Sequence, residues 1–332
     1  MLNSFLTIIC PIYNEEKYIA RCIESIMHQD YPKEDWEVLF VDGMSTDKTR
    51  EIINSYLLQC PYIRILDNPK KIVPIAMNKG ISEAKGDIIM RIDAHTYYES
   101  NYCSAIVRRL KELDADDVGC VCRTNVLNKT PKTMAISEVL GNKFGVGNSV
   151  FRTGVDRVME VDTVPFGCWP KRVFEKYGMY DVRLVRNQDI ELSKRIINGG
   201  GRIFIIPDTH CTYMARETFI GLARNNFGNG KWNVLTVYYT KQIKSLSLRH
   251  FIPLIFVLSL LIPLMIGFFW SPIVLLAISS FFVYLLLLFT ISIKLAVKKH
   301  LNIFFLIWSF ITLHCSYGIG SLMGIFTIPF LK

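Results

Sequence analysis

The chain has 332 residues, of which 51% are hydrophobic, and a formal net charge of +9. This length exceeds one ordinary domain of roughly 100 to 200 residues. The charge does not indicate a nucleic-acid-binding protein, because all 29 acidic residues precede residue 251 and largely balance the basic residues there. The nine cysteines are odd in number and lack a paired CxxC framework, so we expect reduced, structural thiols rather than disulfides.

The first hundred residues alternate short β-rich runs with amphipathic helical stretches. Strands are predicted at 5–10, 36–41, 62–66 and 87–92, and helices at 16–29, 47–59 and 72–85. The alternation is typical of βαβ units. It predicts an α/β fold with a Rossmann-like, mostly parallel sheet and flanking helices. The short apolar run at the N-terminus lacks a basic n-region, so we expect no signal peptide and a catalytic part that stays in the cytosol.

Polar residues follow several of the predicted strands. They occur at 10–15, 42–45 and 93–95. In a parallel sheet, ligands bind beyond the carboxyl ends of the strands. One cleft is therefore expected to collect all three stretches, although they lie far apart in the sequence.

Asp93 and His95 end a buried strand in the stretch GDIIMRIDAH. An ionised carboxylate in apolar surroundings needs a cation or several hydrogen-bond donors. A divalent metal on a pyrophosphate would satisfy Asp93, because hard cations take one or two protein oxygens and complete their shell with phosphate. The imidazole of His95 suits Mn²⁺ better than Mg²⁺. In the alternative interpretation, Asp93 caps a following helix and His95 only packs.

The middle of the chain is less regular. A helix is predicted at 101–114, a strand at 118–124, a Gly-rich loop at 141–155 and a helix at 171–177. Another helix begins near Asp189 and ends at Gly199–Gly201, because glycine adopts the left-handed cap conformation without steric cost. The strand RIFIIP follows.

Three apolar stretches follow residue 250, at 251–270, 273–293 and 303–323. Each approaches the ~20 residues that a membrane-spanning helix needs. Basic residues before the first stretch and between the second and third predict that these ends, and the catalytic domain, face the cytoplasm. The alternative is a buried helical bundle. The segment 232–248 is interpreted as an amphipathic helix at the membrane interface, or else as a last core helix of the soluble domain.

The stretch CPIYNEEKYIARCIESIMHQDYPKEDWEVLFVDGMSTDKTREII resembles the N-terminal half of family 2 glycosyltransferases of the GT-A fold, in which PxYNE and VDxxSxD stretches bind the nucleotide. The likeness continues in order through NKGISEAKGDIIMRIDAH, FGCWPKRVFEKYG, RNQDIELSKRI and ARNNFGNGKW. Within that family the chain looks most like the succinoglycan-type glucosyltransferases of bacterial exopolysaccharide assembly. The resemblance implies a GT-A domain at 1–230, an interfacial segment at 231–250 and three transmembrane helices at 251–332.

The resemblance also implies roles for individual residues. A metal, Mn²⁺ or Mg²⁺, is expected on Asp93 and His95, and Asp189 is expected to be the catalytic base. The residues expected to bind the nucleotide sugar are Pro11, Tyr13, Asn14, Glu15, Asp42, Ser45, Lys85 and Asp93. Those expected at the acceptor are Arg224, Lys231 and Trp232. Gln188 stands where many relatives have Glu. Lys231 stands where Arg is common, and lysine lacks the guanidinium that can donate two parallel hydrogen bonds to one group.

Plainer interpretations of these residues stay open. Asp42 and Ser45 are typical turn residues, which hydrogen-bond the nearby backbone. Lys85 is equally well explained as a solvated side chain. Asp189 would serve as a helix N-cap, and Trp232 as an anchor at the membrane interface.

The expected activity is inverting transfer of a hexose from a UDP-sugar to a polyprenyl-diphosphate-linked saccharide. The protein would be a multi-pass protein of the inner (plasma) membrane in contact with membrane lipid. A polyprenyl-phosphate sugar synthase and a catalytically silent membrane scaffold are the alternatives. A processive synthase is disfavoured because it normally needs more spans. A dinucleotide enzyme is disfavoured because no GxGxxG follows the first strand.

Overall fold

The computed structural model describes residues 4–241 and 246–331. The chain divides into two compact units. The first contains Met1–Arg123 and Val150–Met214, and the second contains Thr124–Ser149 and Ala215–Lys332. Each unit is described here by itself.

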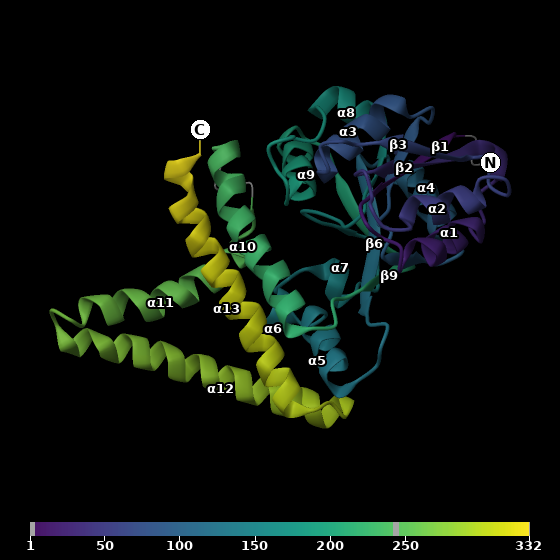
Figure 1. Ribbon diagram of the computed structural model, residues 1–332. Helices are drawn as coiled ribbons and strands as arrows, with labels where there is room; N and C mark the ends of the chain where they lie inside the picture. The colour runs from purple at the N-terminus through teal and green to yellow at the C-terminus, as the bar shows by residue number, and fades with distance from the viewer. Residues whose placement is uncertain (1–3, 242–245, 332) are drawn as a thin grey trace. The chain divides into compact units, whose positions relative to one another are not determined.

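A single mixed sheet forms the centre of the first unit (Figure 1). In the described part of the chain it contains β1 (Leu6–Ile12), β2 (Trp36–Asp42), β3 (Ile63–Asp67), β4 (Ile88–Arg91), β5 (Thr96–Tyr98), β6 (Asp117–Asn125), β7 (Met159–Glu160), β8 (Cys168–Pro170) and β9 (Ile203–Met214). The order is β3-β2-β1-β4-β8-β6-β9-β5, with β7 paired to β9. Strands β1 to β4 pair in parallel, whereas β8 pairs antiparallel with β4, and β5 and β7 pair antiparallel with β9.

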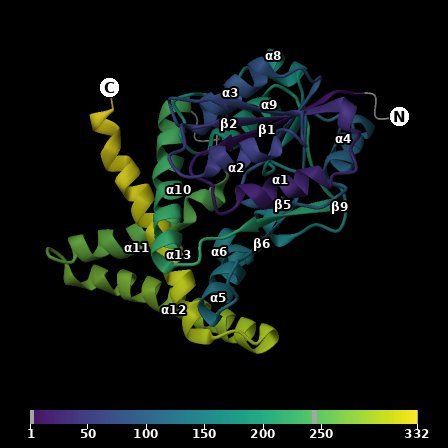
Figure 2. The same cartoon turned by 45° about the vertical axis from the view of Figure 1, so that its right-hand side comes forward.

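Helices cover both faces of this sheet (Figure 2). One face carries α1 (Ile19–Met27), α2 (Thr49–Tyr56) and α4 (Tyr102–Glu112), and the other carries α3 (Val73–Glu83), α8 (Arg172–Tyr177) and α9 (Gln188–Asn198). Successive strand residues point to opposite faces. Ile8 and Cys10 accordingly belong to the first core and Ile9 to the second. The predicted α/β architecture is confirmed.

Two local predictions differ from the structure. The Gly-rich loop at 141–155 contains the short helices α6 (Lys143–Val146) and α7 (Val150–Thr153). The side chain of Asn142 starts α6, since its oxygen accepts a hydrogen bond of 2.9 Å from the Phe144 backbone. Asp93 does not cap a helix, because β5 follows it. The nine cysteines are free thiols, and eight of them are buried.

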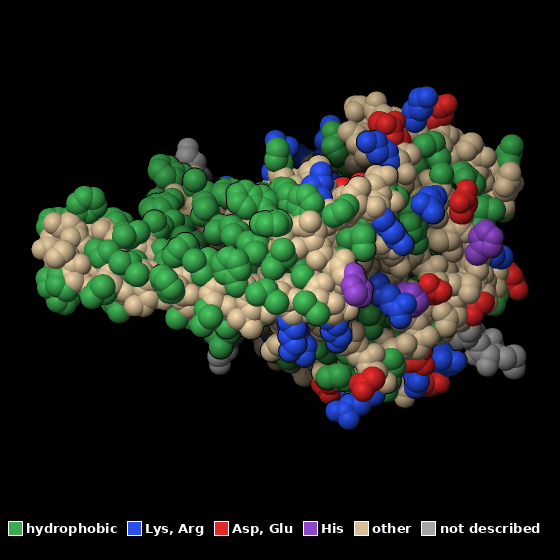
Figure 3. Space-filling view, turned by 90° about the horizontal axis from the view of Figure 1, so that it is seen from below, with side chains coloured by type: hydrophobic (Ala, Val, Ile, Leu, Met, Phe, Trp, Pro, Cys, Tyr) green, Lys and Arg blue, Asp and Glu red, His purple; other side chains and the backbone are tan. Residues whose placement is uncertain are grey.

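The second unit is helical. It contains α5 (Pro131–Leu140), α6, α10 (Phe219–Thr240), α11 (Ile252–Ile266), α12 (Val274–Lys299) and α13 (Ile303–Thr327). Among the described residues two helical segments are long and apolar enough to cross a membrane, Ser271–Lys299 and Ile303–Phe330. Hydrophobic side chains cover most of the visible surface of the α11–α12 hairpin (Figure 3).

Of the three predicted spans, the first corresponds to α11, which is shorter than the other two apolar helices. This helix has 15 residues and contains Pro263. At 1.5 Å per residue it is about 22 Å long, shorter than the ~30 Å hydrocarbon core of a bilayer. The short 3-10 helix Ser271–Ile273 connects α11 to α12, and the two helices form a tight hairpin.

Helices α10 and α13 pack with their backbones in contact. A Cβ atom added at Gly230 would collide with the carbonyl oxygen of Tyr317, and one at Gly320 would collide with that of Phe227. Small residues permit this close approach. Because α10 is continuous from Phe219 to Thr240, the predicted boundary at 230/231 falls inside a helix. Residues 242–245 of the predicted interfacial segment lie outside the described residues.

Candidate active site

Two loops at the carboxyl ends of β1 and β2 are hydrogen-bonded to each other. The Asn14 backbone donates to Ser45 Oγ at 2.9 Å, and the Thr46 backbone donates to Asn14 Oδ1 at 2.8 Å. The Glu15 backbone donates to Thr49 Oγ1 at 2.7 Å. Asn14 has a φ of 56°, a left-handed conformation that asparagine tolerates better than most residues. The structure therefore brings together the two motifs that the sequence predicts to share one ligand.

Asp42 has a different position from the one expected of a direct ligand. Its side chain is fully buried, and its Oδ1 accepts from Ser45 Oγ at 2.6 Å. The Arg50 guanidinium donates to Asp42 at 3.2 Å and to Asp67, at the end of β3, at 2.7 Å. These hydrogen bonds agree with the alternative interpretation, in which Asp42 and Ser45 are turn residues. They hold the loop after β2 in place. The more exposed partner at this edge is Asp67, of which 54% of the side chain is accessible.

Pro11 and Tyr13 lie at the end of the first strand. Pro11 belongs to β1 and pairs in register with Val41 of β2. Tyr13 follows the strand and is 44% exposed, and the Lys71 ammonium lies 5.2 Å from its ring centroid. An exposed aromatic ring beside a cation suits stacking with a nucleobase.

His95 and Glu15 meet although 80 residues separate them. Their Nδ1 and Oε1 atoms are 3.2 Å apart, and the side chains are 26% and 19% exposed. The His95 ring also packs edge-on against Tyr213 at 5.3 Å between centroids. The first motif and the DAH triplet therefore form one cluster.

Arg91, the last residue of β4, donates to Asp93 Oδ1 at 3.2 Å. Its side chain is 9% exposed. Burial lowers the pKa of this guanidinium, but the charges of Asp93 and Asp189 outweigh burial and hold the pKa above its ordinary value. Both carboxylates thus lie within electrostatic range of one buried cation.

Asp189 is the second residue of α9, and the N-cap position is occupied by Asn187. The residues beside Asp189 are not suited to act as the base. Gln188 is buried, and Glu191 pairs with Arg195 at 2.6 Å, so Glu191 is not available as a base. In the first turn of α9, Asp189 is therefore, among the described residues, the carboxylate without an ion-pair partner on its own helix.

The donor set fits a divalent cation held partly by substrate. Asp93 contributes carboxylate oxygens and His95 an imidazole nitrogen. No group of three or more His, Cys, Asp or Glu side chains in the described ranges could hold a metal by itself. A cation held by Asp93 and His95 would complete its shell with phosphate oxygens, as hard cations do.

Several predicted residues do not join this cluster. The Lys85 backbone donates a hydrogen bond to the buried Glu37 at 2.8 Å. Both residues lie near the amino ends of β2 and β4, whereas Asp93 follows the carboxyl end of β4. Arg224, Lys231 and Trp232 lie on α10 in the second unit, and their acceptor role stays a prediction.

Sequence reasoning overlooked Arg50, Asp67 and Arg91. Asp67 could have been found, because the rule that ligands bind at the carboxyl ends of parallel strands applies to β3 as well. Arg50 and Arg91 carry no such signal, since an arginine in a helix or a strand is usually a surface residue.

Comparisons with known proteins agree with this architecture. The sequence profile "Glycosyl transferase family 2" matches residues 7–177. A dolichyl N-acetyl-alpha-D-glucosaminyl phosphate 3-beta-D-2,3-diacetamido-2,3-dideoxy-beta-D-glucuronosyltransferase of Methanococcus voltae is 30% identical over 65% of this chain and 68% of its own length. The succinoglycan biosynthesis protein ExoA of Rhizobium meliloti is 30% identical over 74% of each chain.

Among solved structures, the mannosyltransferase PcManGT of Pyrobaculum calidifontis, in complex with GDP-Man and Mn²⁺, superimposes with a TM-score of 0.63. It is 17% identical, and the match covers 96% of this chain and 87% of that one. At such low identity the likeness concerns the fold, which is the GT-A fold. The profile match over residues 7–177 and the two relatives at 30% identity place the chain in glycosyl transferase family 2, as an enzyme of that family.

Proposed function

We propose that this glycosyltransferase is an inverting, metal-dependent enzyme that moves a hexose from a UDP-sugar to a polyprenyl-diphosphate-linked saccharide at the cytoplasmic face of a membrane. The observation that carries the proposal is the position of Arg91, which contacts Asp93 and lies in electrostatic range of Asp189. This supports a leaving-group site at Asp93 and a base at Asp189 on the same side of the sheet. The loops joined by Asn14 and Glu15 would bind the nucleotide beside them.

The residues would act in one displacement step. Asp189 would take the proton of the acceptor hydroxyl as its oxygen forms a bond to the anomeric carbon. The bond from that carbon to the diphosphate oxygen breaks on the opposite side, and its electron pair leaves with UDP. When bound, a divalent cation stabilises the negative charge that develops on the diphosphate. Asp93 and His95 would hold it, and Glu15 would orient the imidazole.

The donor and the acceptor are inferred from relatives. The R. meliloti relative is named for succinoglycan biosynthesis, and the M. voltae relative for transfer to a dolichyl-phosphate-linked sugar. A fold neighbour, Staphylococcus aureus TarS, was solved with UDP-GlcNAc at a TM-score of 0.52. The two apolar helices of the second unit support placement at a membrane, where such acceptors reside. The domain division at 1–230, 231–250 and 251–332 is proposed as part of this assignment.

A donor panel tests the proposal. Native membranes with extracted lipid acceptors are incubated with radiolabelled UDP-hexoses and GDP-mannose, with and without Mn²⁺. We expect Mn²⁺-dependent transfer from one UDP-hexose to lipid-linked saccharide. Transfer from GDP-mannose alone would overturn the donor assignment, and transfer to polyprenyl phosphate alone would favour a polyprenyl-phosphate sugar synthase. Metal-dependent hydrolysis of a UDP-sugar would exclude a silent scaffold.

A variant of Asp189 tests the assignment of this residue as the catalytic base. Asp189→Asn should lower transfer by about 10³-fold or more, because general base catalysis contributes roughly 10²- to 10⁴-fold. Donor affinity, measured by calorimetry, should change by less than about twofold, since the carboxamide keeps the size of the side chain. The matched control is Asp114→Asn, a charge change at a side chain that is 92% exposed. Unimpaired transfer by Asp189→Asn would remove the base from the mechanism.

A further inference from the structure

A pocket in the second unit lies outside the candidate active site. It has a volume of about 290 Å³ and is lined by Asn125, Val126, Lys129, Met134, Ser137, Glu138, Lys299 and Leu301. These residues come from the end of β6 and the segment after it, from α5, from the last residue of α12 and from the connection to α13. The volume is at the small end of the roughly 300–1,000 Å³ typical of ligand sites, so it suits a headgroup rather than an oligosaccharide.

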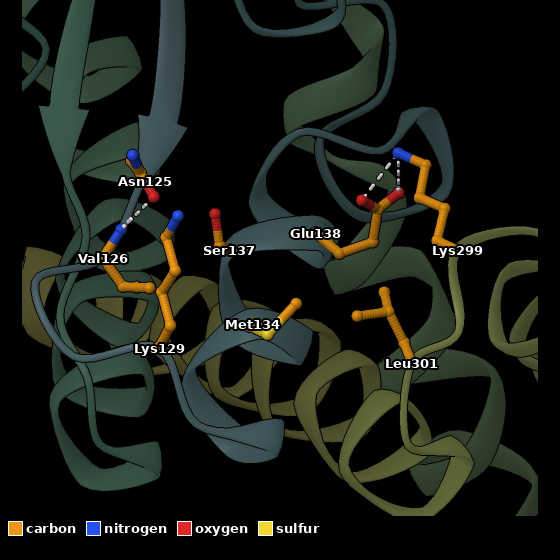
Figure 4. A pocket seen from close by; sticks show the side chains of 8 residues that line it. All are labelled: Asn125, Val126, Lys129, Met134, Ser137, Glu138, Lys299 and Leu301. Atoms are coloured by element: carbon orange, nitrogen blue, oxygen red, sulfur yellow. Dashed lines mark hydrogen bonds and ion pairs between the residues drawn. The ribbon is translucent and has the colours of Figure 1, made fainter.

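Both charged and apolar side chains line the pocket (Figure 4). Lys129 and Ser137 lie on one side and the Glu138–Lys299 pair on the other, with Met134 and Leu301 below them. Lys299 Nζ donates to both carboxylate oxygens of Glu138, at 2.9 Å and 2.7 Å. This pair is neutral overall, so the ammonium of Lys129 gives the pocket a net charge of +1.

The pocket lies where an apolar helix becomes basic. In α12 the first lysine is Lys294, and Lys298 and Lys299 complete its last turn. The 18-residue apolar window of Ser271–Lys299 has a mean hydropathy of 2.6 and is only 11% buried, so most of this surface needs an apolar environment. Lysines at the end of such a helix place their ammonium groups at the level of lipid phosphates.

Helix α5 continues this surface. Ala135 and Val139 of α5 share one core with Leu306 and Phe310 of α13. Around them, Leu127 and Met134 are 42% and 40% exposed, beside Lys129. Exposed apolar side chains next to lysines are the pattern of a protein surface in contact with the membrane interface.

We propose that this pocket binds the phosphate headgroup of an anionic membrane phospholipid. Lys129 contacts the phosphate, and Lys299 shares its ammonium between Glu138 and the lipid. Ser137 Oγ donates to the Thr124 carbonyl at 2.9 Å and therefore shapes the wall without donating to the phosphate. The assignment rests on the proposed membrane placement of α12 and is independent of the roles of Asp93 and Asp189.

The test uses the full chain, purified in a neutral detergent and titrated with short-chain phosphatidylglycerol, with bound lipid counted by native mass spectrometry. Lys129→Gln should weaken binding about fivefold, because one lysine near an anionic surface contributes about that factor. Lys129→Arg should retain binding. Glu138→Gln should strengthen binding, since it frees the Lys299 ammonium. The matched control is Lys111→Gln, the same charge change on an exposed residue of α4.

Three further arms identify the source of the phosphate. Phosphatidylcholine should bind more weakly than phosphatidylglycerol, and inorganic phosphate at millimolar concentration should not displace the lipid. Polyprenyl phosphate should bind without dependence on Lys129. The proposal is overturned if Lys129→Gln and Glu138→Gln leave phosphatidylglycerol binding unchanged, if inorganic phosphate displaces the lipid, or if only polyprenyl phosphate depends on Lys129. Donor hydrolysis, measured on the same preparations, reports separately on the proposed function.

Discussion

Polar side chains are used differently in the two units. At the sheet edge of the first unit they connect segments that follow different strands, as Asn14 is bonded to Ser45 and Thr46, and Arg50 of α2 to Asp67. In the second unit several bond the carbonyl one turn back in their own helix, as Thr236 does to Trp232 and Ser321 to Tyr317, while a few join two helices, as Lys299 does with Glu138. The first arrangement leaves polar atoms directed at a common edge. The bonds within one helix satisfy the hydroxyl groups, and small residues make the close contact between α10 and α13.

This difference predicts which changes remove activity and which remove structure. The edge of the first unit is supported by two buried cores, so a polar residue there can be replaced without unfolding the sheet. The contact between α10 and α13 depends instead on the absence of a side chain at Gly230 and Gly320. The predictions below test each side of the comparison.

The largest effect is expected at Asp93. Asp93→Asn should lower transfer by about 10³-fold, on the order of 4 kcal/mol, because a metal on the leaving group contributes several kcal/mol. The melting temperature should also fall, because the variant removes the negative charge that pairs with the buried Arg91 guanidinium. Binding of Mn²⁺ in the presence of UDP, measured by electron paramagnetic resonance, should weaken in the same variant. Normal Mn²⁺ binding together with lost transfer would assign Asp93 another role.

The second effect concerns packing. Gly320→Ala should destabilise the second unit by about 2 kcal/mol, because the added Cβ collides with the Phe227 backbone and overpacking typically costs about 1–3 kcal/mol. Ile319→Ala, at a neighbouring side chain that is 49% exposed, is the control and should change stability much less. Thermal denaturation in detergent compares the two. Equal stability of the two variants would show that the helices have no close contact.

A third effect tests the joined loops. Asn14→Gly removes the bond to Thr46 while keeping the positive φ accessible, and we expect the donor KM to rise about tenfold. Asn14→Ala should raise it further, since alanine is strained at φ 56°. Kinetics at saturating donor should show a nearly unchanged kcat for Asn14→Gly. A large fall in kcat with constant KM would place Asn14 in the chemical step instead.

The smallest effect is a pH dependence at Asp117. Burial raises the pKa of this carboxyl well above its ordinary value, and the backbone hydrogen bond from Cys168 only partly opposes the shift. The folded protein therefore keeps a proton that the unfolded chain loses above about pH 4. The protonated carboxyl of Asp117 therefore adds to the free energy of unfolding at low pH. This contribution is lost as the pH rises through the pKa that Asp117 has in the folded protein.

Asp117→Asn should remove that loss. Its melting temperature relative to the natural protein should increase between pH 5 and pH 8, by at most about 1.4 kcal/mol of stability for each pH unit. Asp114→Asn, the exposed counterpart, should show no such trend. A constant difference across this range would mean that Asp117 is ionised in the folded state.

Much of the fold could be predicted because its signals are local. The strands around Ile8, Val38 and Ile89 and the helices between them appear as apolar runs and helical periodicity, which depend on neighbouring residues. The short strands β5, β7 and β8 could not be predicted this way. They exist only because β4, β6 and β9 offer free edges to pair with.

The sequence by itself determined the family, the order of the motifs and the apolar character of the last helices, because residue type and spacing carry that information. Only the tertiary structure decided that Asp42 is fully buried, that Lys85 lies at the other edge of the sheet and that Glu15 meets His95. These outcomes depend on contacts between residues far apart in the chain. Strand direction and loop geometry set such contacts, and no local pattern records them.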